Sequence, residues 1–508
     1  MIINLIENFI QTVQTYGHKV AVIDGEQKIP FAELDVMARS AAKDIIDGVQ
    51  QTCKPVAVFL PKSIQAVAAD IAITYSGNAY MNLDIKTPSE RLGNIIRLIQ
   101  PVAIVTNHQY LSKIQSVLPE NICIINWDNE QKNAPDVAYF TEHLKGIIDT
   151  DPYCIINTSG STGTPKGVVL NHKSFIDFME QTFGEYNVSS KDIIGSLSPI
   201  VFDIWSYELC MLMGKGATIV VIPDTYAAFP IKILQLMEQH HVTYIFWVPT
   251  IMVNIANMGL LDKVDLSDLH LCWFAGEVFP TKQFNIWYHA LPSVTFANFY
   301  GPIEITLDCV YYTIDREIPD EEPIPIGKAF RNTDILILDE QNQRVTLPNI
   351  EGELCVRGTS LAMGYYNNPE KTAAAFVQNP LNHSYPEIIY RTGDIVIIND
   401  RGEMVFKGRK DSLIKHQGYR IELTEIEHVI VNVLHLVKNG CVVYNHAAKE
   451  INLFYESENE ISAADFRKAI GGKLPRYMIP MVYTHLDKLQ RNTNGKIDRL
   501  YYNKLVNG

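Results

Sequence analysis

The chain has 508 residues, which is too long for one ordinary hydrophobic core and predicts several packed subdomains. Apolar residues make up 47% of it and charged residues 20%, a globular composition that leaves little room for long disordered segments. The formal charge of −14 argues against an extended nucleic-acid-binding face, which needs clustered Lys and Arg, but not against a nucleotide pocket built locally.

The first predicted element is an amphipathic helix within residues 1–10, where apolar side chains recur at helical spacing. This stretch lacks the positively charged N-terminal region of a signal peptide, and Glu7 interrupts its apolar run. We therefore expect a helix of the folded protein and no signal peptide. Later apolar stretches, such as residues 217–223, are far shorter than the roughly 20 residues that span a bilayer. We therefore expect no membrane insertion and a cytoplasmic location. The eight cysteines form no C-x-x-C pair, and we expect reduced, buried thiols without zinc or disulfides.

Up to about residue 330, short β-rich runs alternate with helical patterns; examples of the runs are residues 55–60, 102–106, 218–222 and 242–247. Such alternation predicts parallel strands with helices on both faces. Strands broken by Gly, Pro and Asn follow between about 324 and 407 and predict a smaller β-rich subdomain. The expected fold class is α/β with several subdomains. A large N-terminal core of doubly wound sheets would cover residues 1–409, and a small, mobile α+β lid would cover 410–508.

The sharpest motif is Thr158-Ser-Gly-Ser-Thr-Gly-Thr-Pro-Lys-Gly167, which follows an apolar, strand-like run. Successive Gly and hydroxyl residues let backbone N–H groups approach a polyphosphate, and Lys166 supplies a positive charge. The segment is not a Walker loop, because Gly167 stands where that loop needs a Ser or Thr for Mg²⁺. The alternative is a flexible surface loop. We predict a phosphate-binding loop.

This loop closely resembles the phosphate loop of the adenylate-forming superfamily, which includes acyl-CoA synthetases, luciferases and amino-acid-activating adenylation domains. Seven further segments match that family in its own order across nearly the whole chain: Asn298–Glu304, Gly352–Gly358, Tyr390–Asp394, Gly408–Asp411, Gly418–Glu422, Leu474–Pro480 and Asn494–Arg499. The resemblance implies that ATP and Mg²⁺ are used to activate a carboxylic acid as its adenylate.

The resemblance also implies catalytic residues. Attack of a carboxylate on the ATP α-phosphate brings anions together, so the enzyme must supply cations and alignment. Lys496 would bridge the substrate carboxylate and the adenylate, with Lys166 and Thr158 also taking part, and Glu304 would bind Mg²⁺. Taken alone, Lys496 is typical of a solvated lysine and Glu304 of a surface acid. Ile303 departs from the family, which usually has Thr there, so a hydroxyl near the α-phosphate is missing.

Asp394 resembles the carboxylate that accepts hydrogen bonds from both ribose hydroxyls, and Tyr300 resembles the ring that stacks on adenine. Without the motif, Tyr300 is equally typical of core packing. The ATP-binding residues implied by the resemblance are Thr158, Ser159, Gly160, Ser161, Thr162, Gly163, Lys166, Asn298, Tyr300, Gly301, Asp394 and Arg409.

Asp203 stands where amino-acid-activating members carry the carboxylate that pairs with the substrate ammonium, a residue that acyl-CoA synthetases generally lack. A fatty or aryl acid would leave this carboxylate unpaired at a cost of roughly 3–5 kcal/mol. The alternative is an aspartate that caps a helix. The family's pocket positions correspond to Asp203, Ile204, Tyr207, Phe246, Trp273, Ala275, Phe299, Leu307, Asp308 and Lys496.

Four of these pocket residues are large aromatics, which favours a small or compact amino acid such as Ala, Gly or Pro, although the rings could instead stack on a substrate ring. Asp308 is a second acid in the pocket. It could bind a side-chain amine or hydroxyl, or the amine of a β-amino acid.

Asp411 resembles the hinge about which the C-terminal lid rotates between half-reactions, withdrawing Lys496 and bringing Gly418-Tyr419-Arg420 to the site for thioester formation. The sequence ends nine residues after Arg499, without a carrier segment there, so we expect transfer to the phosphopantetheine thiol of a separate carrier protein. D-alanine–carrier protein ligases and free-standing adenylation enzymes of nonribosomal peptide synthesis both resemble it. Two alternatives remain: an acyl- or aryl-CoA synthetase, and a non-catalytic nucleotide-binding module. The second stays open because Ile303 and Met363 both depart from the family, which often has Arg at the position of Met363.

Overall fold

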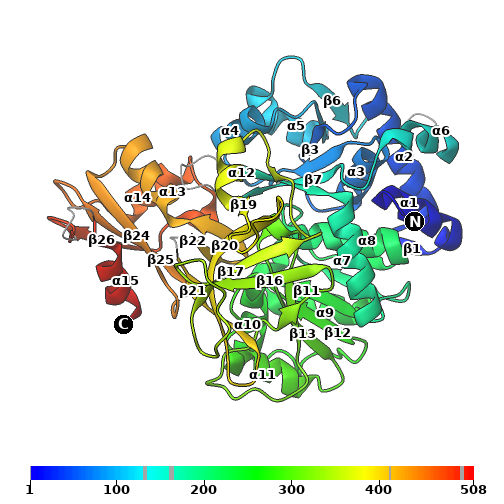
Figure 1. Ribbon diagram of the computed structural model, residues 1–508. Helices are drawn as coiled ribbons and strands as arrows, with labels where there is room; N and C mark the ends of the chain where they lie inside the picture. The colour runs from blue at the N-terminus through cyan, green and yellow to red at the C-terminus, as the bar shows by residue number, and fades with distance from the viewer. Residues whose placement is uncertain (1, 130–133, 159–164, 411–412, 492–496) are drawn as a thin grey trace.

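The computed structural model describes residues 2–129, 134–158, 165–410, 413–491 and 497–508. It confirms the predicted fold class: two large sheets with helices on their faces form the N-terminal part, and smaller sheets follow toward the C-terminus (Figure 1). Among the described residues, no helix combines the length and the apolar character needed to cross a membrane.

The larger sheet has nine strands and is parallel through its middle, with antiparallel pairs toward both edges. Parallel strands of this kind are buried on both faces, which matches their nearly continuous apolar sequences. In spatial order the strands are β15 (Lys328–Ala329), β14 (Val310–Thr313), β13 (Thr295–Tyr300), β12 (Leu271–Phe274), β11 (Tyr244–Trp247), β9 (Ile193–Ser196), β10 (Thr218–Val221), β1 (Val20–Asp24) and β2 (Gln27–Pro30).

The second sheet has seven strands, and its core is again parallel. The predicted phosphate-binding loop connects β7 to the antiparallel β8, so its two ends are fixed by strand pairing. In spatial order the strands are β18 (Gly364–Tyr365), β8 (Lys166–Asn171), β7 (Pro152–Thr158), β4 (Ala79–Asn82), β3 (Pro55–Val58), β5 (Ala103–Thr106) and β6 (Cys123–Asn126).

Helices α3 (Ile64–Tyr75) and α8 (Asp203–Lys215) pack against these sheets and are buried almost all round, so their apolar residues form no single stripe. Two polar contacts join them to their surroundings: Trp205 Nε1 donates to Asp70 Oδ2 at 2.8 Å, and the Tyr80 hydroxyl donates to Ser206 Oγ at 2.7 Å. These contacts fix α8, whose first residue is Asp203.

The remaining helices cover the sheets or belong to the C-terminal part (Figure 1). They are α1 (Leu5–Tyr16), α2 (Phe31–Val49), α4 (Ser89–Ile99), α5 (His108–Ile114), α6 (Val137–His143), α7 (His172–Glu185), α9 (Pro230–Gln239), α10 (Pro249–Asn257), α11 (Thr281–Ala290), α12 (Pro369–Ala375), α13 (Leu423–His428), α14 (Ala463–Gly471) and α15 (Arg499–Asn507). The predicted first helix begins later than residue 1, because Asn4 caps it by accepting a hydrogen bond from the Glu7 N–H.

All eight cysteines are free thiols. The prediction that all are buried is wrong for two of them, since Cys53 and Cys123 are half-buried. Cys53 lies in a turn with positive φ, and Cys123 begins β6 at the edge of its sheet.

A five-stranded sheet follows the two large ones and joins β16 (Thr333–Leu338), β17 (Gly352–Gly358), β20 (Ile388–Ile398), β19 (Phe376–Gln378) and β21 (Met404–Arg409). The C-terminal part then contains the hairpin β22 (Leu413–His416) and β23 (Tyr419–Glu422), and a sheet of β24 (Asn439–Asn445), β25 (Glu450–Glu456) and β26 (Val482–Leu486). The proposed boundary at residue 410 falls between β21 and β22, and the predicted hinge Asp411 lies outside the described residues.

Candidate active site

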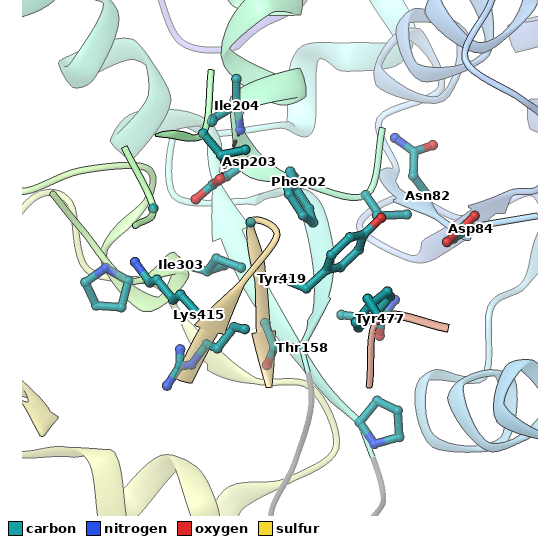
Figure 2. A pocket seen from close by; sticks show the side chains of 18 of the residues that line it. Asn82, Asp84, Thr158, Phe202, Asp203, Ile204, Ile303, Lys415, Tyr419 and Tyr477 are labelled. Atoms are coloured by element: carbon teal, nitrogen blue, oxygen red, sulfur yellow. Dashed lines mark hydrogen bonds between the residues drawn. The ribbon is translucent and has the colours of Figure 1, made fainter. Parts of the chain in front are cut away.

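A cavity of about 130 Å³ lies where the carboxyl ends of several parallel strands meet the β22–β23 hairpin (Figure 2). Crevices at the carboxyl ends of parallel strands are the usual ligand sites of such sheets. The lining includes the last residues of β4 and β7, the start of α8, the segments after β11, β12 and β13, and the hairpin: Asn82, Thr158, Asp203, Val248, Ala275, Gly301 and Lys415 are examples. Ligand pockets usually hold about 300–1,000 Å³. This cavity is smaller than that, and the hairpin forms part of its lining.

The turn after β13 has a strained backbone and carries two acids: Asp308 lines the cavity, and Glu304 is buried behind the lining. Thr306 and Leu307 have φ of 50° and 64°, a left-handed conformation that is costly for residues with a branched or bulky side chain. The carbonyl oxygen of Leu307 would lie 2.3 Å from a Cβ placed on Gly301. Only a residue without a side chain fits at position 301.

Gly301→Ala is therefore expected to displace the turn that carries Glu304 and Asp308, because the new methyl group would meet backbone atoms. We expect ATP–pyrophosphate exchange to fall roughly a hundredfold or more, since misplacement by about 1 Å is that costly in an active site. Circular dichroism would check that the variant is folded. A folded variant with nearly full exchange would contradict the tight packing of this turn.

Glu304 is completely buried, and both of its carboxylate oxygens are engaged. The Tyr365 hydroxyl donates to Oε1 at 2.7 Å, and Arg420 Nη1 from the hairpin pairs with Oε2. Burial by itself would raise the pKa of Glu304, but the Arg420 charge and the Tyr365 hydrogen bond outweigh it and hold the pKa below its usual value. Glu304 is thus an ionised carboxylate at neutral pH.

A Mg²⁺ ion would fit Glu304 only with Arg420 withdrawn, because the guanidinium holds Oε2 in this orientation of the hairpin. In the part of the chain that the structure describes, no group of three or more His, Cys, Asp or Glu side chains is arranged to hold a metal. Mg²⁺ at nucleotide sites commonly takes one or two carboxylates, with phosphate oxygens and water completing the shell. A single carboxylate suits that kind of site.

Asp203 is the first residue of α8 and lines the cavity, while Phe202 is the N-cap. The expectation of an N-cap aspartate is therefore wrong, although Asp203 Oδ1 still accepts a hydrogen bond from the Ile204 N–H at 3.0 Å. Burial raises the pKa of Asp203 to about 6, with the Lys415 charge acting in the opposite direction. The carboxylate is thus charged at neutral pH and faces the cavity.

Asp308 lines the same cavity with 4% of its surface exposed. Burial and the neighbouring Asp203 charge raise the pKa of Asp308 well above its usual value, and the Lys415 charge opposes them. Lys415 reaches the cavity from β22, and its Nζ lies 5.8 Å from the centre of the Tyr300 ring. Figure 2 shows Lys415 and Asp203 on the same side of the pocket.

Four aromatic residues predicted to face the substrate lie behind the cavity lining instead: Tyr207, Phe246, Trp273 and Phe299. They are not among the residues that line the cavity, and each is at most 1% exposed. Trp273 and Phe299 stack with ring centres 4.4 Å apart, Tyr207 stacks on Trp273 at 5.6 Å, and Phe246 meets Trp273 edge-on at 5.6 Å. The rings pack against one another and fill the space behind the lining. Of the other predicted pocket residues, Asp203, Ile204, Ala275, Leu307 and Asp308 line the cavity.

Three of the predicted ATP-binding residues meet in one network. The Tyr300 hydroxyl and Arg409 Nη1 each bond to a different oxygen of Asp394. Asn298 lies two residues before Tyr300 on β13 and is not part of this network; its side-chain amide donates to the Pro325 carbonyl at 2.8 Å.

The two flanks of the predicted phosphate-binding loop also lie at the site. Thr158 is buried and lines the cavity, and Lys166 Nζ lies 5.2 Å from the centre of the Tyr365 ring. The predicted site residues that lie outside the described residues are Ser159, Gly160, Ser161, Thr162, Gly163, Asp411 and Lys496.

The hairpin is joined to the N-terminal part by contacts that the sequence motifs did not reveal. The Gly418 N–H donates to Glu277 Oε1 at 2.8 Å, and the Tyr419 ring meets Phe202 edge-on at 4.8 Å. Nearby, Arg91 pairs with the fully buried Glu425. Lys415 and Tyr365 were also missed as site residues; Lys415 precedes Gly418 by three residues, so its place beside that motif was the available signal.

The chain belongs to the family of AMP-binding enzymes, whose model matches residues 9–366. It is 30% identical over 497 residues to tyrocidine synthase 1 of Brevibacillus parabrevis, covering 97% of this chain and 44% of that protein. It is also 30% identical over 498 residues to zwittermicin A synthase ZmaJ of Bacillus cereus, covering 96% and 92%. The chain thus spans less than half of the first relative and most of the second.

Solved structures of adenylation domains share the fold. The Vibrio cholerae adenylation domain AlmE, in complex with glycyl-adenosine-5′-phosphate, matches with a TM-score of 0.86 at 22% identity, over 99% of this chain and 98% of that one. The o-succinylbenzoate CoA synthetase MenE of Bacillus subtilis matches with a TM-score of 0.83 at 18% identity, over 98% and 97%. The chain is thus a member of the AMP-binding enzyme family and has the fold of adenylation domains.

Proposed function

We propose that this enzyme activates a small or compact amino acid of the Ala, Gly or Pro type with ATP, and then transfers the aminoacyl group to the phosphopantetheine thiol of a separate carrier protein. The observation that carries the proposal is Asp203, a half-buried carboxylate that faces a small cavity at the start of α8. An ammonium group satisfies such a carboxylate, whereas an apolar acid leaves it unpaired. The packed rings behind the lining support a compact substrate.

In the first step, a carboxylate oxygen of the amino acid attacks the α-phosphorus of ATP. The bond between the α-phosphorus and the bridging oxygen breaks, and pyrophosphate leaves with its electron pair. Asp203 holds the substrate ammonium, Lys166 and Thr158 flank the phosphates, and Lys496 joins the carboxylate to the phosphate. Catalysis of this kind depends mainly on alignment and fixed charges.

Mg²⁺, when bound, neutralises phosphate charge, and Glu304 is the residue that would hold it. Both oxygens of Glu304 already accept bonds in the described orientation, so binding requires the hairpin to move. Tyr300 and Asp394 would hold the adenosine, with Asp394 exchanging its present partners for the ribose hydroxyls.

In the second step, the thiolate sulfur of the carrier attacks the carbonyl carbon of the adenylate, the bond from that carbon to the AMP oxygen breaks, and AMP leaves. The docked hairpin supports this step, because Gly418 and Arg420 approach the cavity while their partners Glu277 and Glu304 anchor them. A Cβ at position 418 would lie 2.9 Å from both Phe202 and Val248, so the hairpin tip approaches the core closely.

An acyl- or aryl-CoA synthetase is the second candidate, supported by the shared fold of MenE. It predicts that free CoA is a good acceptor and that acids without an amine are activated. A non-catalytic module predicts no turnover with any acid. It is the least supported, because Asp203 and Thr158 line the cavity and Glu304 pairs with the cavity-lining Arg420.

The test is ATP–pyrophosphate exchange across protein, D- and non-protein amino acids, with fatty and aryl acids as controls. Strong exchange with a small amino acid is expected. Exchange with amine-free acids alone would instead favour the CoA synthetase. Absence of exchange with every acid would favour a non-catalytic protein.

Asp394→Ala is expected to raise the KM for ATP by roughly ten- to a hundredfold, because charge-assisted hydrogen bonds are worth about 1.5–3 kcal/mol. The KM for the amino acid should change far less, since Asp394 is paired with Tyr300 and Arg409 rather than facing Asp203. Initial rates of exchange at varied ATP would measure it. An unchanged KM for ATP would remove Asp394 from the ribose site.

A further inference from the structure

Asp308 is a buried carboxylate in the proposed amino-acid pocket with no bonding partner of its own. It is 4% exposed and lines the cavity, and no hydrogen bond or salt bridge joins it to any residue that the structure describes. Neither of its carboxylate oxygens is among the fully buried atoms without a partner, so they reach the space of the cavity, where a ligand can bind them. We propose that Asp308 binds a second amine, and that the substrate is a short diamino acid.

The charges around the cavity support a second positive group on the substrate. Two acids of the site already have cationic partners, because Arg420 pairs with Glu304 and Arg409 pairs with Asp394. Asp203 and Asp308 remain, and the substrate's α-ammonium satisfies one of them. The effect of the Asp203 charge on the pKa of Asp308 supports their being neighbours.

Lys415 shows that an ammonium group fits this part of the cavity, since it lines the same space as both acids. It forms no salt bridge with either of them among the described residues, although its charge acts to lower the pKa of both, and it reaches the cavity from β22 of the hairpin. The inference rests on the proposed function, in which the hairpin is withdrawn during adenylation. In that orientation the two carboxylates face the substrate without Lys415.

The space behind the lining limits where the second amine lies. Trp273 and Phe299 close that space with fully packed rings, and Ile204 and Leu307 are apolar parts of the wall. A long side chain such as that of lysine or ornithine would have to enter this packed region. We therefore expect a substrate with one or two methylene groups between Cα and the amine, as in 2,3-diaminopropionate or 2,4-diaminobutyrate.

The experiment compares kcat/KM in ATP–pyrophosphate exchange for 2,3-diaminopropionate, 2,4-diaminobutyrate, ornithine, alanine, glycine, serine and β-alanine. We expect one of the two short diamino acids to exceed alanine at least tenfold. Asp308→Ala should lower the ratio of diamino acid to alanine roughly a hundredfold, because it removes a buried charge-assisted bond. The matched control is Asp268→Ala, an exposed acid that contacts only His241 among the described residues and should leave the ratio unchanged.

The outcomes separate this inference from the function on which it rests. Strong exchange with alanine or glycine and none with diamino acids would overturn the inference while the proposed function survives. A preference for β-alanine would also overturn it, because Asp308 would then hold the single displaced amine. No exchange with any amino acid would overturn both. Isothermal titration of Asp308→Ala and the parent protein with the preferred amino acid provides a readout independent of turnover.

Discussion

Asp203→Ala is expected to lower amino-acid-dependent ATP–pyrophosphate exchange at least a hundredfold. The substrate ammonium would enter a half-buried site without its counter-charge, and breaking an ion pair from one side costs up to about 3–5 kcal/mol when the pair is buried. The loss should fall mainly on kcat/KM for the amino acid, with a smaller effect on the KM for ATP. Steady-state exchange at varied amino acid and fixed ATP measures both.

The pH dependence gives an independent check on the same carboxylate. The pKa of Asp203 is raised to about 6, so the charged form that binds an ammonium is lost as the pH falls through 6. We expect kcat/KM for the amino acid to be level between about pH 7 and 8.5 and to fall about tenfold for each unit well below 6. The exposed-acid variant Asp268→Ala should keep the profile of the parent protein. A retained rate in Asp203→Ala, or a profile level to pH 5, would remove Asp203 from substrate binding.

Arg420→Ala is expected to separate the two half-reactions. In the docked orientation the variant leaves the buried Glu304 carboxylate without its cationic partner, at a cost of roughly 3–5 kcal/mol. The docked orientation should become rare, so transfer from the adenylate to the carrier thiol is expected to fall at least a hundredfold. Exchange should change less than about tenfold, because the proposed first step uses Glu304 without Arg420.

Single-turnover transfer of radiolabelled amino acid to a carrier protein, beside exchange on the same preparation, measures this separation. Lys473→Ala is the matched control: its pair with Glu90 also joins the C-terminal part to the core but is exposed, and such pairs are worth at most about 1 kcal/mol. Equal losses of exchange and transfer in Arg420→Ala would show that Arg420 acts in adenylation as well, and would contradict the assignment.

Much of the fold could be predicted from the sequence, because local patterns carry it. The alternation of apolar strands and helices gave the parallel sheets, and residues 55–60 and 102–106 contain β3 and β5. Motif order then pointed to the residues around the cavity, since Thr158, Asp203 and Gly301 each lie at the end of a strand or the start of a helix.

The rest depended on tertiary contacts that no local pattern records. Tyr207 and Trp273 were matched to the family's pocket by their positions in the sequence. In the structure their rings stack on each other in the core, a contact that sequence position alone does not reveal. Arg91 was missed because its partner Glu425 is distant in sequence and only the docked C-terminal part brings the two together. Lys415 was missed although it precedes Gly418 by only three residues, because only the docked hairpin brings it to the cavity.

The aromatic packing behind the cavity links substrate choice to the folding of the whole protein. Trp273, Phe299, Tyr207 and Phe246 belong to the hydrophobic core shared by the two large sheets. Replacing one buried aromatic by alanine costs roughly 3–5 kcal/mol, a large part of the 5–15 kcal/mol that separates a folded domain from its unfolded state. Replacing one of these rings to make room for a larger substrate side chain would therefore remove a large part of the free energy that keeps the protein folded. Asp308 lies outside that hydrophobic cluster and lines the cavity, so a substitution there changes the site without opening a void among these rings.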